Sequence, residues 1–225
     1  MEPYYILKIN KFSEAHENYT TSQQLGIESF DDAPAVSFTK SQNLTIGDLH
    51  VGKYDLTTEK KTTQRGRACG SHEVFESFIA IKDSTFYCNS CENNLMLHCP
   101  KDTFNQFFNA FENNKYFKFS KPIVNFEDII DNQKSLGIQG IWLGKIDDVN
   151  ISTLLLLGTN VEDSDKYRQL RAAGAEINNI TIVYNFNEVQ KKVMITKDGG
   201  IILYKSAKET DALLLVNDIY KNLMS

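Results

Sequence analysis

The second half of the chain carries the clearest pattern of hydrophobic and polar positions. Beyond Pro122, short apolar runs are separated by polar residues and glycines, which is typical of strands joined by turns and helices. The Asp198-Gly199 pair divides two such runs and predicts a tight hairpin over residues 193–205. The pattern also predicts strands over 140–146, 152–159 and 177–185, and helices over 124–137, 161–173 and 208–224.

The first half is less regular. Residues 4–9, 35–40, 44–56 and 115–121 are expected to form strands, whereas residues 13–34 and 57–67 are too polar for a core and are expected to be loops, the first of them with a weak helix as the alternative. One helix stands out after Pro100, because its phenylalanines recur at the spacing of a single helix face. These are Phe104, Phe107, Phe108 and Phe111, and we expect them to pack into the core.

This order of elements predicts an α+β or α/β protein of two subdomains. Pro122 marks the boundary, with an α+β subdomain over residues 1–121 and a small mixed sheet carrying two or three helices over residues 122–225. A chain of 225 residues is long enough for either one large core or two small ones.

Cysteine and histidine residues in the first subdomain have the spacing of a zinc site. Cys69 and His72 form one pair with a two-residue gap, and Cys88 and Cys91 form another. A gap of two residues lets a tight turn present both side chains to one ion. If Lys82 and Asp83 form a turn, the segment folds into a hairpin that brings the two pairs together. The segment is then similar to a zinc ribbon or zinc knuckle, and four protein ligands make the zinc structural.

Two alternatives to this ligand set remain open. His98 and Cys99 follow Cys91 closely, so either of them could replace a ligand of the first pair. The cysteines could also be buried free thiols, which behave as small apolar residues.

Charge adds a candidate partner surface. The formal net charge is −5, which argues against attraction of the whole protein to nucleic acid or anionic lipid. Between residues 60 and 67, however, four basic residues occur without an acidic one, namely Lys60, Lys61, Arg65 and Arg67. The run is expected to be either a solvated loop or a contact surface for a protein or nucleic-acid partner.

The N-terminal residues and the apolar runs indicate where in the cell the protein is expected to be. The acid at position 2 and the brief apolar run after it differ from a secretory signal, and the longest purely apolar run, residues 154–157, is far too short to cross a bilayer. We therefore expect a cytoplasmic protein with no membrane segment.

The sequence as a whole favours a zinc-stabilised, soluble binding or accessory protein inside the cell. The alternative is a metal-dependent phosphodiesterase or nuclease, in which Asp48, His50 and Glu59 hold a metal ion near the basic run. That alternative requires the three side chains to meet in one cleft.

Overall fold

The computed structural model is built mainly from antiparallel β-strands. It describes residues 1–13, 16–21, 34–68, 71–112, 114–133 and 137–224, with the backbone alone for 64–68, 71–78 and 133. Twelve strands hold 49% of the residues and four α-helices belong to the 23% that are helical, all counted within the described ranges. The predicted zinc-stapled subdomain followed by a small mixed sheet is therefore wrong, because antiparallel pairing dominates both halves of the chain.

The chain divides into two compact units. The N-terminal unit comprises Ile9–Ser120, and the C-terminal unit comprises Met1–Lys8 together with Lys121–Ser225. The expected boundary at Pro122 lies beside this division, whereas the first eight residues join the C-terminal unit. Strand β1 (Glu2–Lys11) supplies residues to both units.

The N-terminal unit is an antiparallel sheet with one helix. Its strands follow the order β2-β3-β4-β5-β6. The elements are β2 (Asn18–Thr20), β3 (Val36–Ile46), β4 (Leu49–Ala68), β5 (Ser71–Asn89), β6 (Asn94–His98), α1 (Lys101–Phe111) and β7 (Lys118–Ser120). The end of β1 adjoins β6, where the Ile9 N–H donates to the Asn93 carbonyl over 2.8 Å.

Aromatic rings fill the core between the sheet and α1. Phe104, Phe107 and Phe111 of α1 are fully buried, which confirms the helix and the face predicted for it. The ring of Phe107 lies 5.6 Å from that of Phe86 on β5, and the ring of Phe111 lies 5.9 Å from that of Phe38 on β3. These contacts hold α1 against the sheet by burial of apolar area.

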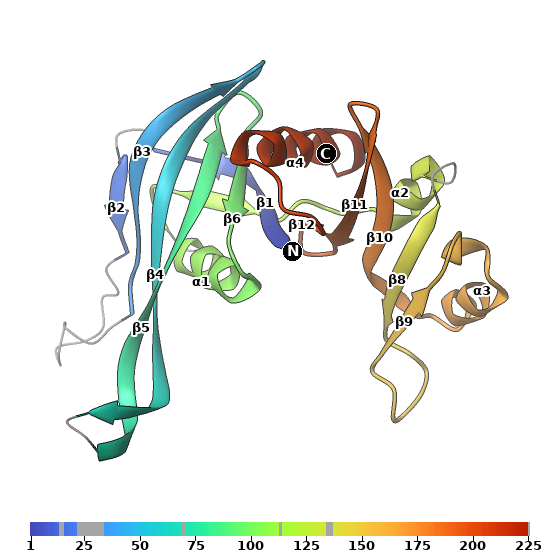
Figure 1. Cartoon of the computed structure of the whole chain (residues 1–225), viewed down its shortest axis with the longest axis horizontal. Helices are drawn as coiled ribbons and strands as arrows, with labels where there is room; N and C mark the ends of the chain where they lie inside the picture. Colours follow the sequence, from blue (N-terminus) through green and yellow to red (C-terminus); the bar gives the residue numbers. More distant parts are fainter. Residues whose placement is uncertain (14–15, 22–33, 69–70, 113, 134–136, 225) are drawn as a thin grey trace. The chain divides into compact units, whose positions relative to one another are not determined.

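Strands β4 and β5 continue far beyond their neighbours (Figure 1). Strand β3 pairs with β4 only as far as Thr58, and β6 pairs with β5 only from Thr85 to Asn89. Within the described residues, strand segments 59–68 and 71–81 pair only with each other, apart from a bond of the Glu59 N–H to the Ala35 carbonyl, and we call this two-stranded extension the ribbon. The expected loop at 57–67 is thus a strand, because its threonines favour extended backbone and β5 supplies a hydrogen-bonding partner along its whole length.

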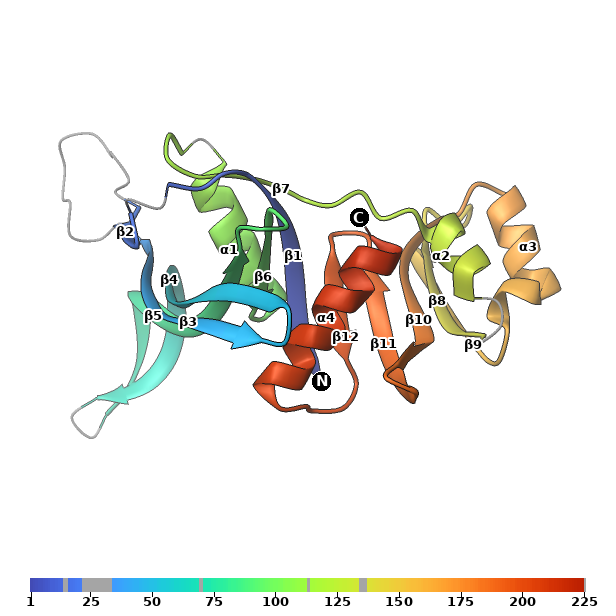
Figure 2. The same ribbon diagram turned by 90° about the horizontal axis from the view of Figure 1, so that it is seen from above.

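The C-terminal unit holds the remaining antiparallel strands of the sheet. Its strands follow the order β1-β12-β11-β10-β8-β9. The further elements are α2 (Phe126–Gln133), β8 (Ile138–Gly144), β9 (Thr153–Leu157), the 3₁₀ turn η2 (Val161–Asp163), α3 (Asp165–Ala172), β10 (Glu176–Phe186), β11 (Val189–Thr196), β12 (Gly200–Leu203) and α4 (Glu209–Leu223). Figure 2 shows α4 lying alongside β11 and β12. The structure has a strand or helix at each predicted place in this half, and it confirms the hairpin at Asp198-Gly199, where Val193 pairs with Leu203. The predicted helix over 161–173 is a 3₁₀ turn followed by α3, and residues 134–136 of the helix predicted over 124–137 lie outside the described residues.

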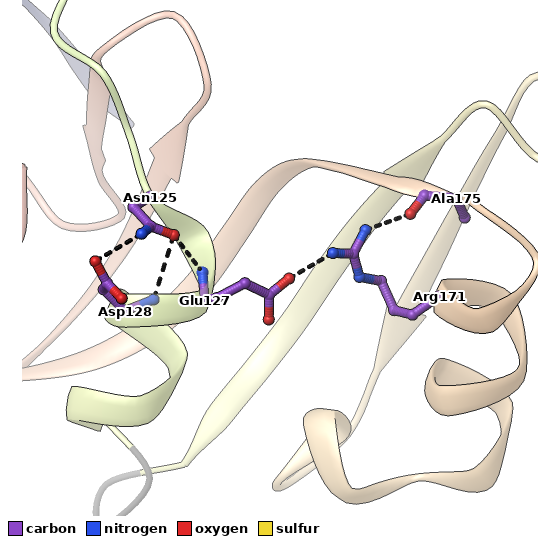
Figure 3. A network of polar contacts seen from close by, with 5 residues as sticks. All are labelled: Asn125, Glu127, Asp128, Arg171 and Ala175. Carbon is purple, nitrogen blue, oxygen red and sulfur yellow. Dashed lines mark hydrogen bonds and ion pairs between the residues drawn. The ribbon is translucent and has the colours of Figure 1, made fainter.

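Helices α2 and α3 are tied together at their ends (Figure 3). The Asn125 side chain accepts a hydrogen bond from the Glu127 N–H over 3.2 Å, which caps the start of α2. Arg171, at the end of α3, donates to the Glu127 carboxylate over 2.5 Å and to the carbonyl of Ala175. One arginine therefore fixes both the end of α3 and its distance from α2.

Tyr184 links β10 to α4, and the ionisation of its hydroxyl lowers the free energy of unfolding at alkaline pH. Its hydroxyl donates to Asp218 over 2.5 Å and accepts from Asn222 over 3.1 Å. Burial, and then the bond to Asp218, raise the pKa of Tyr184 from 10.0 to about 12. A raised folded-state pKa means that this stabilisation is complete below the unfolded pKa and is lost as pH rises through the folded pKa.

We therefore expect the urea midpoint of the C-terminal unit to fall as pH rises from 10 to about 12. The fall should be shallower in Tyr184→Phe, which has no hydroxyl to titrate. Parallel urea curves of both proteins across this pH range measure the difference. Equal slopes would show that the phenol of Tyr184 does not contribute.

Candidate nucleic-acid interface

The structure places the predicted zinc ligands along one long strand rather than around a point. Cys88 is buried on β5 opposite Gly52, and Cys91 is exposed in the turn that follows β5. The backbone of His72 belongs to the same strand, opposite Arg67 near the far end of the ribbon. Cys69 lies outside the described residues.

The two pairs do not meet because β5 is continuous. Lys82 pairs with Thr58 and Asp83 with Thr57, so the expected turn at these residues is part of a strand. His72 and Cys88 are sixteen positions apart on it, roughly 50 Å of extended chain. Among the described residues no three Cys, His, Asp or Glu side chains are grouped to bind a metal ion. The zinc-ribbon interpretation is wrong for this reason.

The two alternative ligands have ordinary structural positions. His98 ends β6 opposite Thr85. Cys99 is 2% exposed, and burial raises the pKa of its thiol to about 12. A thiol that stays protonated is a poor metal ligand and behaves as an apolar side chain, which agrees with the buried-thiol alternative for this residue.

We expect purified protein to contain well under one equivalent of zinc per chain. A site with both Cys-His and Cys-Cys pairs cannot close around one ion when its halves lie so far apart on β5. Elemental analysis after dialysis against a weak chelator measures the content. One equivalent of zinc that disappears in Cys88→Ala/Cys91→Ala would contradict this expectation.

The residues of the nuclease alternative are also separated. Asp48 lies in the β3–β4 turn, and His50, at the start of β4, has its Nδ1 3.1 Å from the Thr45 hydroxyl. Glu59 lies nine residues further along β4, roughly 30 Å of extended chain, and accepts a hydrogen bond from the Ala35 N–H over 3.0 Å. The structure does not bring Asp48, His50 and Glu59 into one cleft.

The basic run, by contrast, occupies a distinctive position. Lys60 and Lys61 are exposed at the root of the ribbon, and neither has an ion-pair partner among the described residues. Neighbouring residues of a strand point to opposite faces, so the two lysines place a cation on each face of the ribbon. The backbones of Arg65 and Arg67 continue the same strand toward its tip.

A cavity of about 550 Å³ opens beside these lysines. Side chains with hydrogen-bonding groups line it from α1, namely Gln106 and Asn109, and Tyr19 of β2 adds an aromatic ring. The Tyr19 hydroxyl accepts from the Asn114 amide over 2.8 Å, which orients both groups. Sequence reasoning missed this cavity, although the i, i+3 spacing of Gln106 and Asn109 on a predicted helix would have put both amides on one face.

The surface therefore combines a two-stranded ribbon, an exposed lysine on each of its faces at the root, and a polar cavity beside them, which the Glu59 carboxylate also lines. These groups can contact phosphates and form hydrogen bonds with bases or sugars. No family model matches the chain, and no curated protein matches it either. Within the described residues, no helix is both long and apolar enough to cross a membrane.

Proposed function

We propose that this protein is a non-enzymatic binding protein whose ribbon contacts nucleic acid. The observation that carries the proposal is the position of the basic run. Its four cations lie on one strand of a two-stranded extension, with no acidic residue between positions 60 and 67. Phosphate contacts from lysine and arginine supply most of the affinity of such surfaces.

The shape of the ribbon supports the same partner. The major groove of B-DNA is about 12 Å wide and admits a two-stranded β-ribbon. A ribbon with one cation on each face can approach the phosphates on both walls of a groove. A two-stranded ribbon is marginally stable without further packing. A partner that covers the ribbon would therefore stabilise it.

Charge distribution supports contact through the ribbon alone. The protein as a whole is acidic at −5, so nucleic acid would be repelled from most of its surface and attracted to the basic run. The cavity beside Lys60 offers amide groups, and asparagine and glutamine pair with adenine through two hydrogen bonds when the geometry allows. A cytoplasmic location is part of the proposal, and a reducing compartment is consistent with the described cysteines Cys88, Cys91 and Cys99, which form no disulfide with one another.

A binding titration tests the proposal. The probes are fluorescein-labelled duplex and single-stranded DNA of about 20 nucleotides, which is long enough for the contacts of one ribbon. Each probe is titrated with the full chain, and binding is followed by fluorescence anisotropy. The variant Lys60→Ala/Lys61→Ala/Arg65→Ala/Arg67→Ala is expected to bind at least about tenfold more weakly than the natural sequence.

The control removes the same amount of charge elsewhere. Lys145→Ala/Lys166→Ala/Arg168→Ala/Lys197→Ala loses four positive charges from exposed positions of the C-terminal unit. It should retain most of the affinity if the ribbon makes the contact. Equal weakening in both variants would mean that net charge alone governs binding. No binding by the natural sequence at low salt would favour a protein partner for the ribbon.

A further inference from the structure

Strand β11 has an open edge where β12 ends. The last pair between the two strands is Val193 with Leu203, and the Tyr204 N–H then donates to the Lys192 carbonyl over 3.4 Å. Beyond that bond, residues 189–191 pair with β10 on one side, and no described strand pairs with them on the other. Backbone N–H and C=O groups of one residue point to the same side of an antiparallel strand and alternate along it. The backbone groups of Gln190, like those of Lys192, therefore face the open edge.

A groove runs beside this edge. It has a volume of about 580 Å³ and lies between β11, the segment after β12 and the first half of α4. Buried apolar side chains form its floor, among them Val193, Leu203 and Leu215. Val189 at the end of the strand is 52% exposed, which leaves apolar area uncovered beside an unpaired backbone.

Three lysines line the groove, namely Lys191, Lys192 and Lys205. Alternation along the strand places Lys191 on the same face as Val193, toward α4, and Lys205, in the segment after β12, also lines the groove. On the opposite face, the Lys192 ammonium lies 5.1 Å from the centre of the Tyr204 ring. None of the three lysines has an ion-pair partner among the described residues, and Asp211 is the acidic residue of the lining.

We propose that this groove binds an extended acidic peptide segment of a partner protein, which adds a strand to the sheet beside β11. The open backbone of Gln190 would pair with the peptide backbone, and the apolar floor would take its alternate apolar side chains. Carboxylates on the remaining positions would point to the opposite face, where Lys192 lies, and Lys191 and Lys205 beside the floor would attract the net negative charge of the peptide, which is why the proposal specifies an acidic peptide. The groove shares no residue with the ribbon, so this proposal does not depend on nucleic-acid binding.

A designed peptide serves as the probe. A fluorescein-labelled peptide of alternating valine and glutamate is titrated with the full chain and followed by anisotropy, and a valine-lysine peptide of equal length is the control ligand. We expect saturable binding of the acidic peptide and none of the basic one. Lys191→Glu/Lys205→Glu should weaken binding at least about tenfold, while Lys166→Glu, an exposed lysine on α3, should leave it unchanged.

The added strand is tested by Gln190→Pro. Proline removes the N–H that faces the open edge and leaves the ladder between β10 and β11 intact, since edge strands tolerate proline where the N–H faces solvent. Loss of peptide binding with an unchanged circular dichroism spectrum is the expected result. The natural sequence should likewise fail to bind the same peptide N-methylated at alternate residues, which provides the test without any change to the protein.

Two outcomes would overturn the proposal. The first is no binding of the acidic peptide by the natural sequence. The second is binding that tolerates both Gln190→Pro and N-methylation, because the groove would then hold side chains of an anionic amphiphile without pairing to a backbone. DNA binding by the same samples is measured separately, so failure of the peptide proposal and failure of the nucleic-acid proposal are distinguished.

Discussion

Phe107→Ala is expected to destabilise the N-terminal unit by about 3–5 kcal/mol, the usual cost of removing a buried phenylalanine. The side chain is 0% exposed, and its ring lies 4.7 Å from that of Phe111 and 5.5 Å from that of Phe119. Alanine would leave a cavity between α1 and the sheet. A loss of this size approaches the whole stability of a small unit, so much of it should be unfolded at room temperature.

The neighbouring residue gives the matched control. Phe108 is half-buried and lies 6.2 Å from Phe104 by ring centres, so Phe108→Ala should cost less than about 1.5 kcal/mol. Urea unfolding followed by circular dichroism measures both variants. A similar cost for the two substitutions would mean that α1 does not pack through the face described above.

Gly199→Ala is expected to destabilise the C-terminal unit by about 2–4 kcal/mol. Gly199 has a φ of +81°, and a Cβ there would lie 2.7 Å from Cγ of Pro122 and 3.0 Å from the Ile6 carbonyl oxygen. The Ile6 N–H also donates to the Gly199 carbonyl over 2.9 Å. The substitution therefore forces the first strand and the hairpin apart.

Gly174→Ala is the control that measures backbone strain without a steric clash. Gly174 has a φ of +91°, but a Cβ there would meet nothing within 4 Å. Only the strain of the left-handed backbone applies, so the expected cost is about 1 kcal/mol. Thermal or urea unfolding of the two variants compares them directly. If Gly199→Ala cost no more than Gly174→Ala, the close approach of Pro122 and Ile6 to Gly199 would be incorrect.

The sequence correctly predicted the elements whose structure is determined by neighbouring residues. The phenylalanine spacing in residues 104–111 identified α1 and its buried face, because helix periodicity and burial are both set within a few turns. The Asp198-Gly199 pair identified its hairpin, since a positive φ at glycine determines the chain reversal there.

Long-range pairing was beyond the same reasoning. The polar composition of residues 57–67 indicated a loop, but cross-strand hydrogen bonds with β5 hold these residues in a strand whatever their polarity. The zinc interpretation required a turn at Lys82, so that Cys69 and His72 would meet Cys88 and Cys91. A two-residue gap describes each pair by itself and says nothing about the length of the strand between the pairs. The return of β1 to pair with β12, nearly two hundred residues later, likewise has no local signal.

The sequence showed where the basic run lies but did not indicate its function. Four cations in eight residues are consistent with a solvated loop or with a contact surface. Placement on the two-stranded ribbon, beside a cavity with amide groups, favours contact with nucleic acid. The edge of β11 had no counterpart in the sequence, because its openness depends on where β12 ends.

The most direct test of nucleic-acid binding through the ribbon is the dependence of DNA affinity on salt concentration. Each phosphate contact contributes about 0.9 to the slope of log affinity against log salt. We expect the natural sequence to show a steep negative slope, and the variant without the four ribbon cations to show one that is shallower by up to about 3.6. Identical slopes for the two proteins would contradict the account, because the phosphates would then be contacted by other parts of the molecule.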